Sequence, residues 1–321
     1  MKIFLLLIFF SINAVAQQKE NNYFNQTPPG DTPKIFAAGI ISDEFGNRDM
    51  AISPLGDELF YTLQFQSGRG FSTIMHCKSI NGKWTQSEVA TFCGKYNDLE
   101  PAFSPDGSKL YFVSSRPVSG TANKDYDIWY VTKTNGVWSN ATNAGSPVNT
   151  GEDEYYPSIT KTGNIYFTRA VQGREEDIML CRFKKNQYDT AVSLPDAINS
   201  VGDEFNSFVD PDEKFILFTG YKRKGAYAAG DLYISKKNER GEWTEAIDLG
   251  NVINQPGLNY CPYISPDKKY FFFTSNRGGV KAPFAEQQNA KSLYKQMHST
   301  LNGADNIYWM EAKTIIDINN K

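Results

Sequence analysis

Histidine, cysteine and the short motifs of nucleotide chemistry are scarce in this sequence. It has two histidines and four cysteines among 321 residues, without a C-x-x-C pair or the spacing of zinc ligands. No G-x-S-x-G elbow, P-loop or dinucleotide glycine fingerprint is present. We therefore expect no metal site, no cofactor and no serine-esterase domain. The pairing of the cysteines stays open for Cys77, Cys93, Cys181 and Cys261.

An excess of positive charge is also missing. The 33 lysines and arginines face 36 aspartates and glutamates, for a formal net charge of -3, whereas nucleic-acid binders need a clustered basic surface. Beyond the N-terminus, no apolar run approaches the 18 residues that indicate a membrane-spanning helix. We expect neither a nucleic-acid partner nor a transmembrane segment in the mature chain.

Residues 1–16 have the order of a signal peptide. M-K is followed by the apolar run IFLLLIFF and by A-V-A, which ends at Ala16 and fits a small-x-small cleavage site. We expect cleavage after Ala16 and export, to the periplasm of a Gram-negative host or to the medium. The polar, proline-containing residues 17–32 predict a flexible lead-in, and residues 33–321 are then one domain.

One hairpin motif occurs five times. Its copies begin AISPLGDELFYT, AFSPDGSKLYFV, SITKTGNIYFT, FVDPDEKFILFT and YISPDKKYFFFT. Each copy joins a short apolar strand to an aromatic-rich strand. Most do so through a Pro-Asp-Gly-like turn, in which Pro presets φ, Asp bonds its own backbone and Gly adopts positive φ. Copies recur at intervals of roughly 50 residues, a repeat length typical of propeller blades.

Further strands follow each hairpin, and several contain the Asn-Gly signal of a tight turn. The sequence therefore predicts an all-β protein, a β-propeller of four-stranded antiparallel blades. We count five blades, and a sixth would need one unit that the repeat does not reveal. The fifth unit lacks its fourth strand, and PKIFAAGIIS (Pro33–Ser42) resembles an orphan strand that would complete that blade and close the ring. The alternative is an open stack of β-meanders.

The order SPDG-x-x-LYF, Arg, D-I-W/Y resembles the WD40-like PD40 repeats of TolB-type β-propellers, and also short exported propellers of the Bacteroidetes type. The resemblance covers nearly all of residues 33–313. It implies a propeller fold. For function it implies only that such blades serve as protein-docking modules or as gates on hydrolases, because fold alone does not define activity.

Polar residues begin the expected innermost strand of each blade. One aligned column contains Asn47, Asp98, Glu154, Glu204 and Asn259, and a second contains Asp49, Glu100, Tyr156, Asn206 and Cys261. The starts of these strands would meet at one mouth of the central channel. Asp98, Glu154 and Glu204 are therefore candidate catalytic carboxylates of a glycosidase-like centre. The alternative is that repeated polar residues solvate strand ends and anchor loops.

Four arginines form another column, each following the second strand of a blade. They are Arg116, Arg169, Arg223 and Arg277. Their guanidinium groups would bind a carboxylate or phosphate ligand. The alternative is a brace within each blade to the residue that begins the third strand, which is Asp127, Asp177, Asp231 or Asn306.

The fifth blade carries a long insertion between Arg277 and Asp305. Its stretch 286–301 is rich in Gln, Ala, Lys and Leu and predicts a short helix. Lys291 and Tyr294 are candidate contact residues there, since long loops on rigid scaffolds often bind partners. The alternative is a surface loop without a partner.

These observations favour an exported, non-enzymatic binding module that docks a protein, peptide or glycan on the channel face. The four column arginines, Asn47, Asn259, Lys291 and Tyr294 are its candidate binding residues. The alternative is a carbohydrate-active hydrolase with a central carboxylate cluster, and a third hypothesis is a structural subunit of an envelope complex. The sequence does not identify the ligand, the partner or the functional rim.

Overall fold

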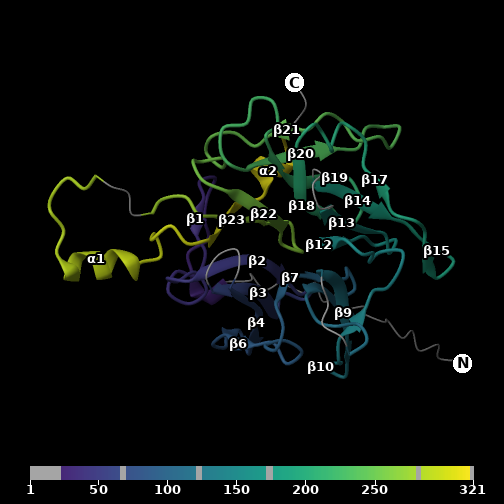
Figure 1. Ribbon diagram of the computed structural model, residues 1–321, viewed down its shortest axis with the longest axis horizontal. Coiled ribbons are helices and arrows are strands. Elements are labelled where there is room, and N and C mark those ends of the chain that lie inside the picture. Colours follow the sequence, from purple (N-terminus) through teal and green to yellow (C-terminus); the bar gives the residue numbers. More distant parts are fainter. Residues whose placement is uncertain (1–22, 66–69, 121–124, 171–175, 280–282, 319–321) are drawn as a thin grey trace, which may run out of the picture.

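The protein is described by a computed structural model over residues 23–65, 70–120, 125–170, 176–279 and 283–318. The expected signal peptide lies outside these residues. Five antiparallel sheets make up the body of the molecule (Figure 1). The prediction of a five-blade β-propeller is therefore confirmed.

Each sheet is one blade whose strands follow the chain. Blade 1 contains β2 (Gly46–Ile52), β3 (Glu58–Phe65), β4 (Phe71–Ile80) and β5 (Lys83–Trp84), with β6 (Glu88–Val89) also paired to β4. Blade 2 contains β7 (Asp98–Phe103), β8 (Lys109–Ser114), β9 (Asp127–Thr134) and β10 (Val137–Trp138), with β11 (Thr142–Asn143) also paired to β9. Blade 3 contains β12 (Asp153–Ile159), β13 (Ile165–Ala170), β14 (Glu176–Cys181) and β17 (Val192–Ser193), beside the small hairpin of β15 (Phe183–Lys184) and β16 (Gln187–Tyr188).

The last two blades follow the same plan. Blade 4 contains β18 (Asp203–Val209), β19 (Phe215–Tyr221), β20 (Asp231–Lys236) and β21 (Ile247–Asp248). Blade 5 contains β22 (Asn259–Ile264), β23 (Tyr270–Ser275), β24 (Asn306–Glu311) and, from the other end of the chain, β1 (Lys34–Ile35). Short helical segments are η1 (Tyr23–Asn25), α1 (Ala290–Met297) and α2 (Lys313–Ile316).

The ring closes through the N-terminal strand, as predicted. β1 pairs antiparallel with β24, with Lys34 opposite Trp309 and Ile35 opposite Tyr308. The innermost strands β2, β7, β12, β18 and β22 contact one another in a complete cycle. Closure covers the edge of blade 5, which would otherwise expose unpaired backbone groups.

Five apolar clusters lie between the blades, one at each boundary. For example, Phe60 and Ile74 of blade 1 pack with Phe112 and Trp129 of blade 2. Every blade is thus a layer packed against two neighbours, and the hydrophobic core is divided among the five boundaries between blades. This arrangement explains why apolar side chains occur on both faces of the inner strands, instead of the simple in-out alternation of a half-exposed sheet.

The predicted flexible lead-in does not hold for its first described residues. Tyr23 is 1% exposed, and its ring lies edge-to-face to Phe36 and Phe272. Phe24 stacks on Trp84 with ring centroids 5.0 Å apart. The packed domain therefore includes Tyr23, ahead of the predicted boundary at Pro33.

Closure of the ring depends on Phe36, which is fully buried and whose amide donates to the carbonyl of Ile307. We predict that Phe36→Ala lowers the free energy of unfolding by about 3–5 kcal/mol, because a large ring is removed from a packed interface. Urea unfolding measures this change. The control Ile40→Ala, at a half-exposed site, should change stability by no more than about 0.5 kcal/mol. A loss below about 1 kcal/mol for Phe36→Ala would contradict this account.

Candidate functional site

The innermost strand of every blade contains a bulge at one residue with left-handed backbone. These residues are Asp49 (φ 50°), Glu100 (φ 59°), Tyr156 (φ 48°), Asn206 (φ 49°) and Cys261 (φ 52°), and at each one the pairing with the second strand shifts register. They are the second polar column of the sequence. A bulge re-aims its side chain, and here the five re-aimed residues meet around the channel.

Threonines of the preceding blade bond three of these bulges. Thr62 Oγ1 accepts the amide of Glu100 at 3.0 Å, and the same contact joins Thr168 to Asn206 and Thr274 to Asp49. The equivalent residue of blade 2 is Val113, which has no hydroxyl, and there the Glu100 carboxylate accepts the amide of Tyr156 at 2.7 Å. The left-handed conformation is unfavourable for these side chains, and such hydrogen bonds offset part of its cost.

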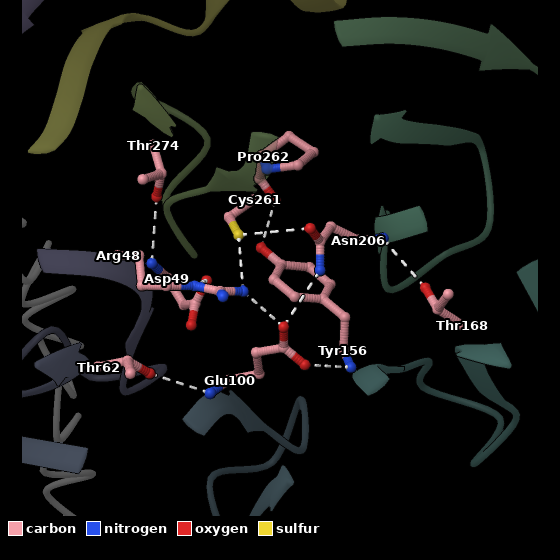
Figure 2. A network of polar contacts seen from close by, with 10 residues as sticks. All are labelled: Arg48, Asp49, Thr62, Glu100, Tyr156, Thr168, Asn206, Cys261, Pro262 and Thr274. Carbon is pink, nitrogen blue, oxygen red and sulfur yellow. Dashed lines mark hydrogen bonds and ion pairs between the residues drawn. The ribbon is translucent and has the colours of Figure 1, made fainter. Parts of the chain in front are cut away.

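Arg48 connects the side chains that cross the channel (Figure 2). Its Nε donates to Asp49 Oδ1 at 2.9 Å and its Nη2 to Glu100 Oε1 at 2.6 Å. The same Nη2 lies 3.5 Å from Cys261 Sγ, and Asn206 Nδ2 donates to Glu100 Oε1 at 3.3 Å. The network fills the middle of the channel. Sequence reasoning missed Arg48, because no other blade has an arginine before its bulge residue.

One cation in this network faces two buried carboxylates. Burial raises the pKa of Glu100 to about 7, with Arg48 opposing the rise and Asp49 adding to it. Among the described residues, Arg48 is the one charged side chain that bonds Glu100, and the other two donors are the Asn206 side chain and the Tyr156 amide. Glu100 therefore holds a proton at a higher pH than an ordinary glutamate.

The predicted acids and the predicted arginines bond to each other. The contacts are Arg116 Nη2 to Asp98 Oδ1 (2.6 Å), Arg169 Nε to Glu154 Oε1 (3.0 Å), Arg223 Nη1 to Glu204 Oε1 (2.8 Å) and Arg277 Nη2 to Asn259 Oδ1 (2.8 Å). Each joins the second-strand end of a blade to its own first strand. The predicted brace to the third strand is therefore wrong in its partner. For instance, Asp127 accepts from Asn143 instead.

Each arginine also donates to a backbone carbonyl of the preceding blade. The acceptors are Phe92 O for Arg116, Val148 O for Arg169, Ile198 O for Arg223 and Ile253 O for Arg277. The residues of the first polar column are all fully buried: Asn47, Asp98, Glu154, Glu204 and Asn259. Burial raises the pKa of Asp98 and Glu154, against the lowering effect of their arginines and hydroxyl partners. These residues link neighbouring blades, and the arginine side chains are only 11–15% exposed where they pair with acids.

An open cavity of about 1220 Å³ lies next to these arginine links, at the mouth of the channel where the first strands begin. We call it the polar mouth. Its described lining includes the acids Glu100, Asp125, Glu152, Asp153, Glu176 and Asp203, the aromatics Tyr126, Tyr155, Phe205, Tyr221 and Tyr260, and one basic residue, Arg48. None of the predicted catalytic or binding residues lines it.

Glu176 has a distinct chemistry in the polar mouth. Its backbone amide donates to Asp203 Oδ1 at 3.0 Å. Burial, with the nearby charges of Asp203 and Asp153, raises the pKa of its carboxyl to about 6. Asp153 and Asp203 directly precede the predicted Glu154 and Glu204, so strand alternation was the signal that would have found them.

A second cavity of about 250 Å³ lies at the opposite end of the channel. We call it the turn-side pocket, because the prolines of the SPDG-type turns, Pro54, Pro105, Pro211 and Pro266, line it. Glu100 borders both cavities. The Arg48 network thus lies between the two cavities.

The fifth-blade insertion forms an arm that stands away from the body (Figure 1). It carries α1, which confirms the expected short helix, and Asn289 and Ser292 form a capping box at its start. Lys291 and Tyr294 are exposed, and neither lines the polar mouth or the turn-side pocket. A role of the arm in binding stays a prediction.

All four cysteines lie in the described part of the chain, and each is a free thiol. Among the residues that the structure describes, no group of three or more His, Cys, Asp and Glu side chains is arranged to hold a metal ion. No helix in the same part of the chain is long and apolar enough to cross a membrane.

No protein-family model matches the sequence, and no curated protein matches it. Among solved structures, a glycoside hydrolase is 9% identical with a TM-score of 0.52, over 92% of this chain and 95% of the other. The structure of BT0996 in an RGII complex is 10% identical with a TM-score of 0.51, over 91% and 95%. TolB from Acinetobacter baumannii is 15% identical with a TM-score of 0.48, over 84% of this chain.

The chain spans 57% of the length of that TolB structure. TolB-type propellers are thus among its structural neighbours, and at these identities the likeness shows the fold alone. The resemblance to Bacteroidetes-type exported propellers stays a prediction.

We predict that Arg116→Met lowers the free energy of unfolding by about 3–5 kcal/mol, because it leaves the buried Asp98 carboxylate without its cation. Adding Asp98→Asn should recover part of the loss, since it removes the unpaired buried charge, and blade 5 already has an asparagine, Asn259, at this position. Chemical unfolding of the single and double variants measures both effects. Arg240→Met, at an exposed turn, is the control and should be nearly neutral. Equal stability of Arg116→Met and Arg240→Met would disprove the link.

We also predict a pH-dependent effect of Glu100→Gln. A carboxyl whose folded pKa is raised from 4.5 to about 7 stabilises the fold below pH 4.5 and loses that contribution as pH rises toward 7. Glutamine mimics the protonated acid, so the stability of the variant relative to wild type should rise over this window, by on the order of 3 kcal/mol. Urea unfolding at pH 4.5, 5.5 and 7 measures it. A difference that is constant with pH would show that Glu100 keeps an ordinary pKa.

Proposed function

We propose that the protein is an exported binding module that docks a protein, peptide or glycan at the polar mouth and does not catalyse a reaction. The observation that carries this proposal is the composition of that cavity. The cavity has a volume of about 1220 Å³, and its lining contains both carboxylates and tyrosines. The buried arginine links between blades hold the strands that carry these side chains. Such a concave site with a few convergent polar groups is the default place for a ligand.

The lining favours a ligand that is rich in hydrogen-bond donors. An ionised carboxylate accepts hydrogen bonds and donates none, and the described lining contains six acids against one arginine. Sugar hydroxyls and the side chains of lysine or arginine supply such donors. Tyrosine rings add flat apolar surface for sugar faces, peptide side chains or cationic groups.

The geometry does not favour a hydrolase built on Asp98, Glu154 and Glu204. These carboxylates have no exposed surface, and each is bonded to an arginine. A hydrolase remains the second candidate because of Glu176, whose raised pKa suits a general acid and which lies beside Asp203 in the polar mouth. In that case Glu176 would donate the proton to the leaving group.

The test is calorimetric titration of the mature chain from Gln17 with a lysine-rich peptide and with a panel of neutral oligosaccharides. We predict that one class binds and that the double variant Glu152→Gln/Glu176→Gln raises its Kd about tenfold or more, because two acceptors lose charge. Binding of the peptide should also weaken with salt, and binding of a neutral glycan should not.

The matched control is Glu239→Gln/Glu245→Gln, which removes two exposed carboxylates away from the polar mouth. Equal affinities of both double variants and wild type would refute docking at this mouth. Release of new reducing ends from an oligosaccharide, lost in Glu176→Gln, would replace the binding module by the hydrolase.

A further inference from the structure

The turn-side pocket differs from the polar mouth in chemistry and in symmetry. Its described walls are mainly aliphatic, aromatic and proline side chains, including Met50, Ile52, Ile159 and Ile264. Its rim carries two ion pairs, Lys161 with Asp212 and Lys268 with Asp210. The charged groups at the rim thus already have partners within the protein.

One column of the repeat explains why the pocket is open. The residue two positions before the turn serine or its equivalent is small in blades 1, 2 and 3, where it is Ala51, Ala102 and Ser158. The same position is aromatic in blades 4 and 5, where it is Phe208 and Tyr263. All of them except Ala51 line the pocket. Two small residues therefore leave a hollow opposite an aromatic wall.

The aromatic wall is held in place. The rings of Phe208 and Tyr263 lie edge-to-face, with centroids 5.5 Å apart and planes at 82°. The Tyr263 hydroxyl bonds the backbone of Ile52 in the neighbouring blade 1, at 3.0 Å to the amide and 3.2 Å to the carbonyl. Proline rings at the turns are closed onto their own backbone nitrogen and cannot swing into or out of the hollow, and the hydroxyl contacts of Tyr263 hold its ring.

We propose that the turn-side pocket is a binding site for a compact aromatic ligand of two fused rings, with no charged group at its inner end. An apolar cavity of about 150 Å³ holds benzene, so about 250 Å³ accommodates an indole-sized group. At the inner end both Glu100 oxygens are already bonded, to Arg48 and Asn206 and to the amide of Tyr156. The ligand gains apolar contact and an edge-to-face partner in Phe208 or Tyr263.

The probe is indole, titrated into the full mature chain and followed by calorimetry and by methyl NMR. We expect a Kd below about 1 mM and methyl shifts at Met50, Ile52, Ile159 and Ile264. Ala102→Phe should raise the Kd at least tenfold, because its ring fills the hollow. The control Ala285→Phe makes the same substitution at an exposed site of the arm and should leave the Kd unchanged.

The source of the ring is distinguished with N-acetyltryptophanamide, which mimics a tryptophan within a peptide. Binding of indole alone assigns the site to a free small molecule, and binding of both, each weakened by Ala102→Phe, assigns it to a side chain of a protein partner. The proposal is overturned if neither probe binds, or if methyl shifts occur away from the pocket. The NMR result holds even if Ala102→Phe does not fold, and it is independent of binding at the polar mouth.

Discussion

The bond between a buried first-strand side chain and an arginine from the end of the second strand is the contact on which the rest of this propeller depends. In blades 2 to 5 the same guanidinium also bonds a carbonyl of the preceding blade. One residue therefore joins two strands of its own blade and the loop of its neighbour. Because a buried charge without its partner is costly, the strand starts are held in one arrangement, and these starts form the floor of the polar mouth.

Among the described residues of blade 1 no arginine takes this place, and the boundary of this blade with blade 5 is built differently. There the side-chain amide of Asn47 donates to Asp43 Oδ1 and to the carbonyl of Phe45, within its own segment, while Tyr23, Phe36, Phe272 and Trp309 form a shared aromatic cluster. This is the boundary at which the two ends of the chain meet. Apolar burial replaces the polar link at the one interface that has to form between segments far apart in sequence, where the loop-closure cost is largest.

Much of the fold was predictable because each blade repeats the same local signals. The SPDG turns act as expected: Ser104 Oγ bonds Asp106 at 2.6 Å, and Gly107 has a φ of 72°. The pairing of the arginines was not predictable from order along the chain. Arg169 lies within its strand, whereas Arg116, Arg223 and Arg277 lie beyond theirs, so only tertiary geometry brings all four to the same position. The prolines after Glu100, Tyr156 and Cys261 were an unused signal for bulges, since proline inside a strand marks a bulge or an edge.

The division of the channel follows from the same repeat and its exceptions. The left-handed bulges direct five side chains of different chemistry to the same depth of the channel, between its two ends. Arg48 bonds several of them, including the two carboxylates. Above this level the side chains are acidic and aromatic, and below it they are the apolar residues beside the turns. If the sequence repeated perfectly, the same residue would occur five times around the channel at each depth. A charged residue would then face four like charges, and a small residue would leave a symmetric hole along the channel axis. The departures from the repeat, at Arg48, Val113, Phe208 and Tyr263, are therefore what give this ring a closed middle and two chemically different ends.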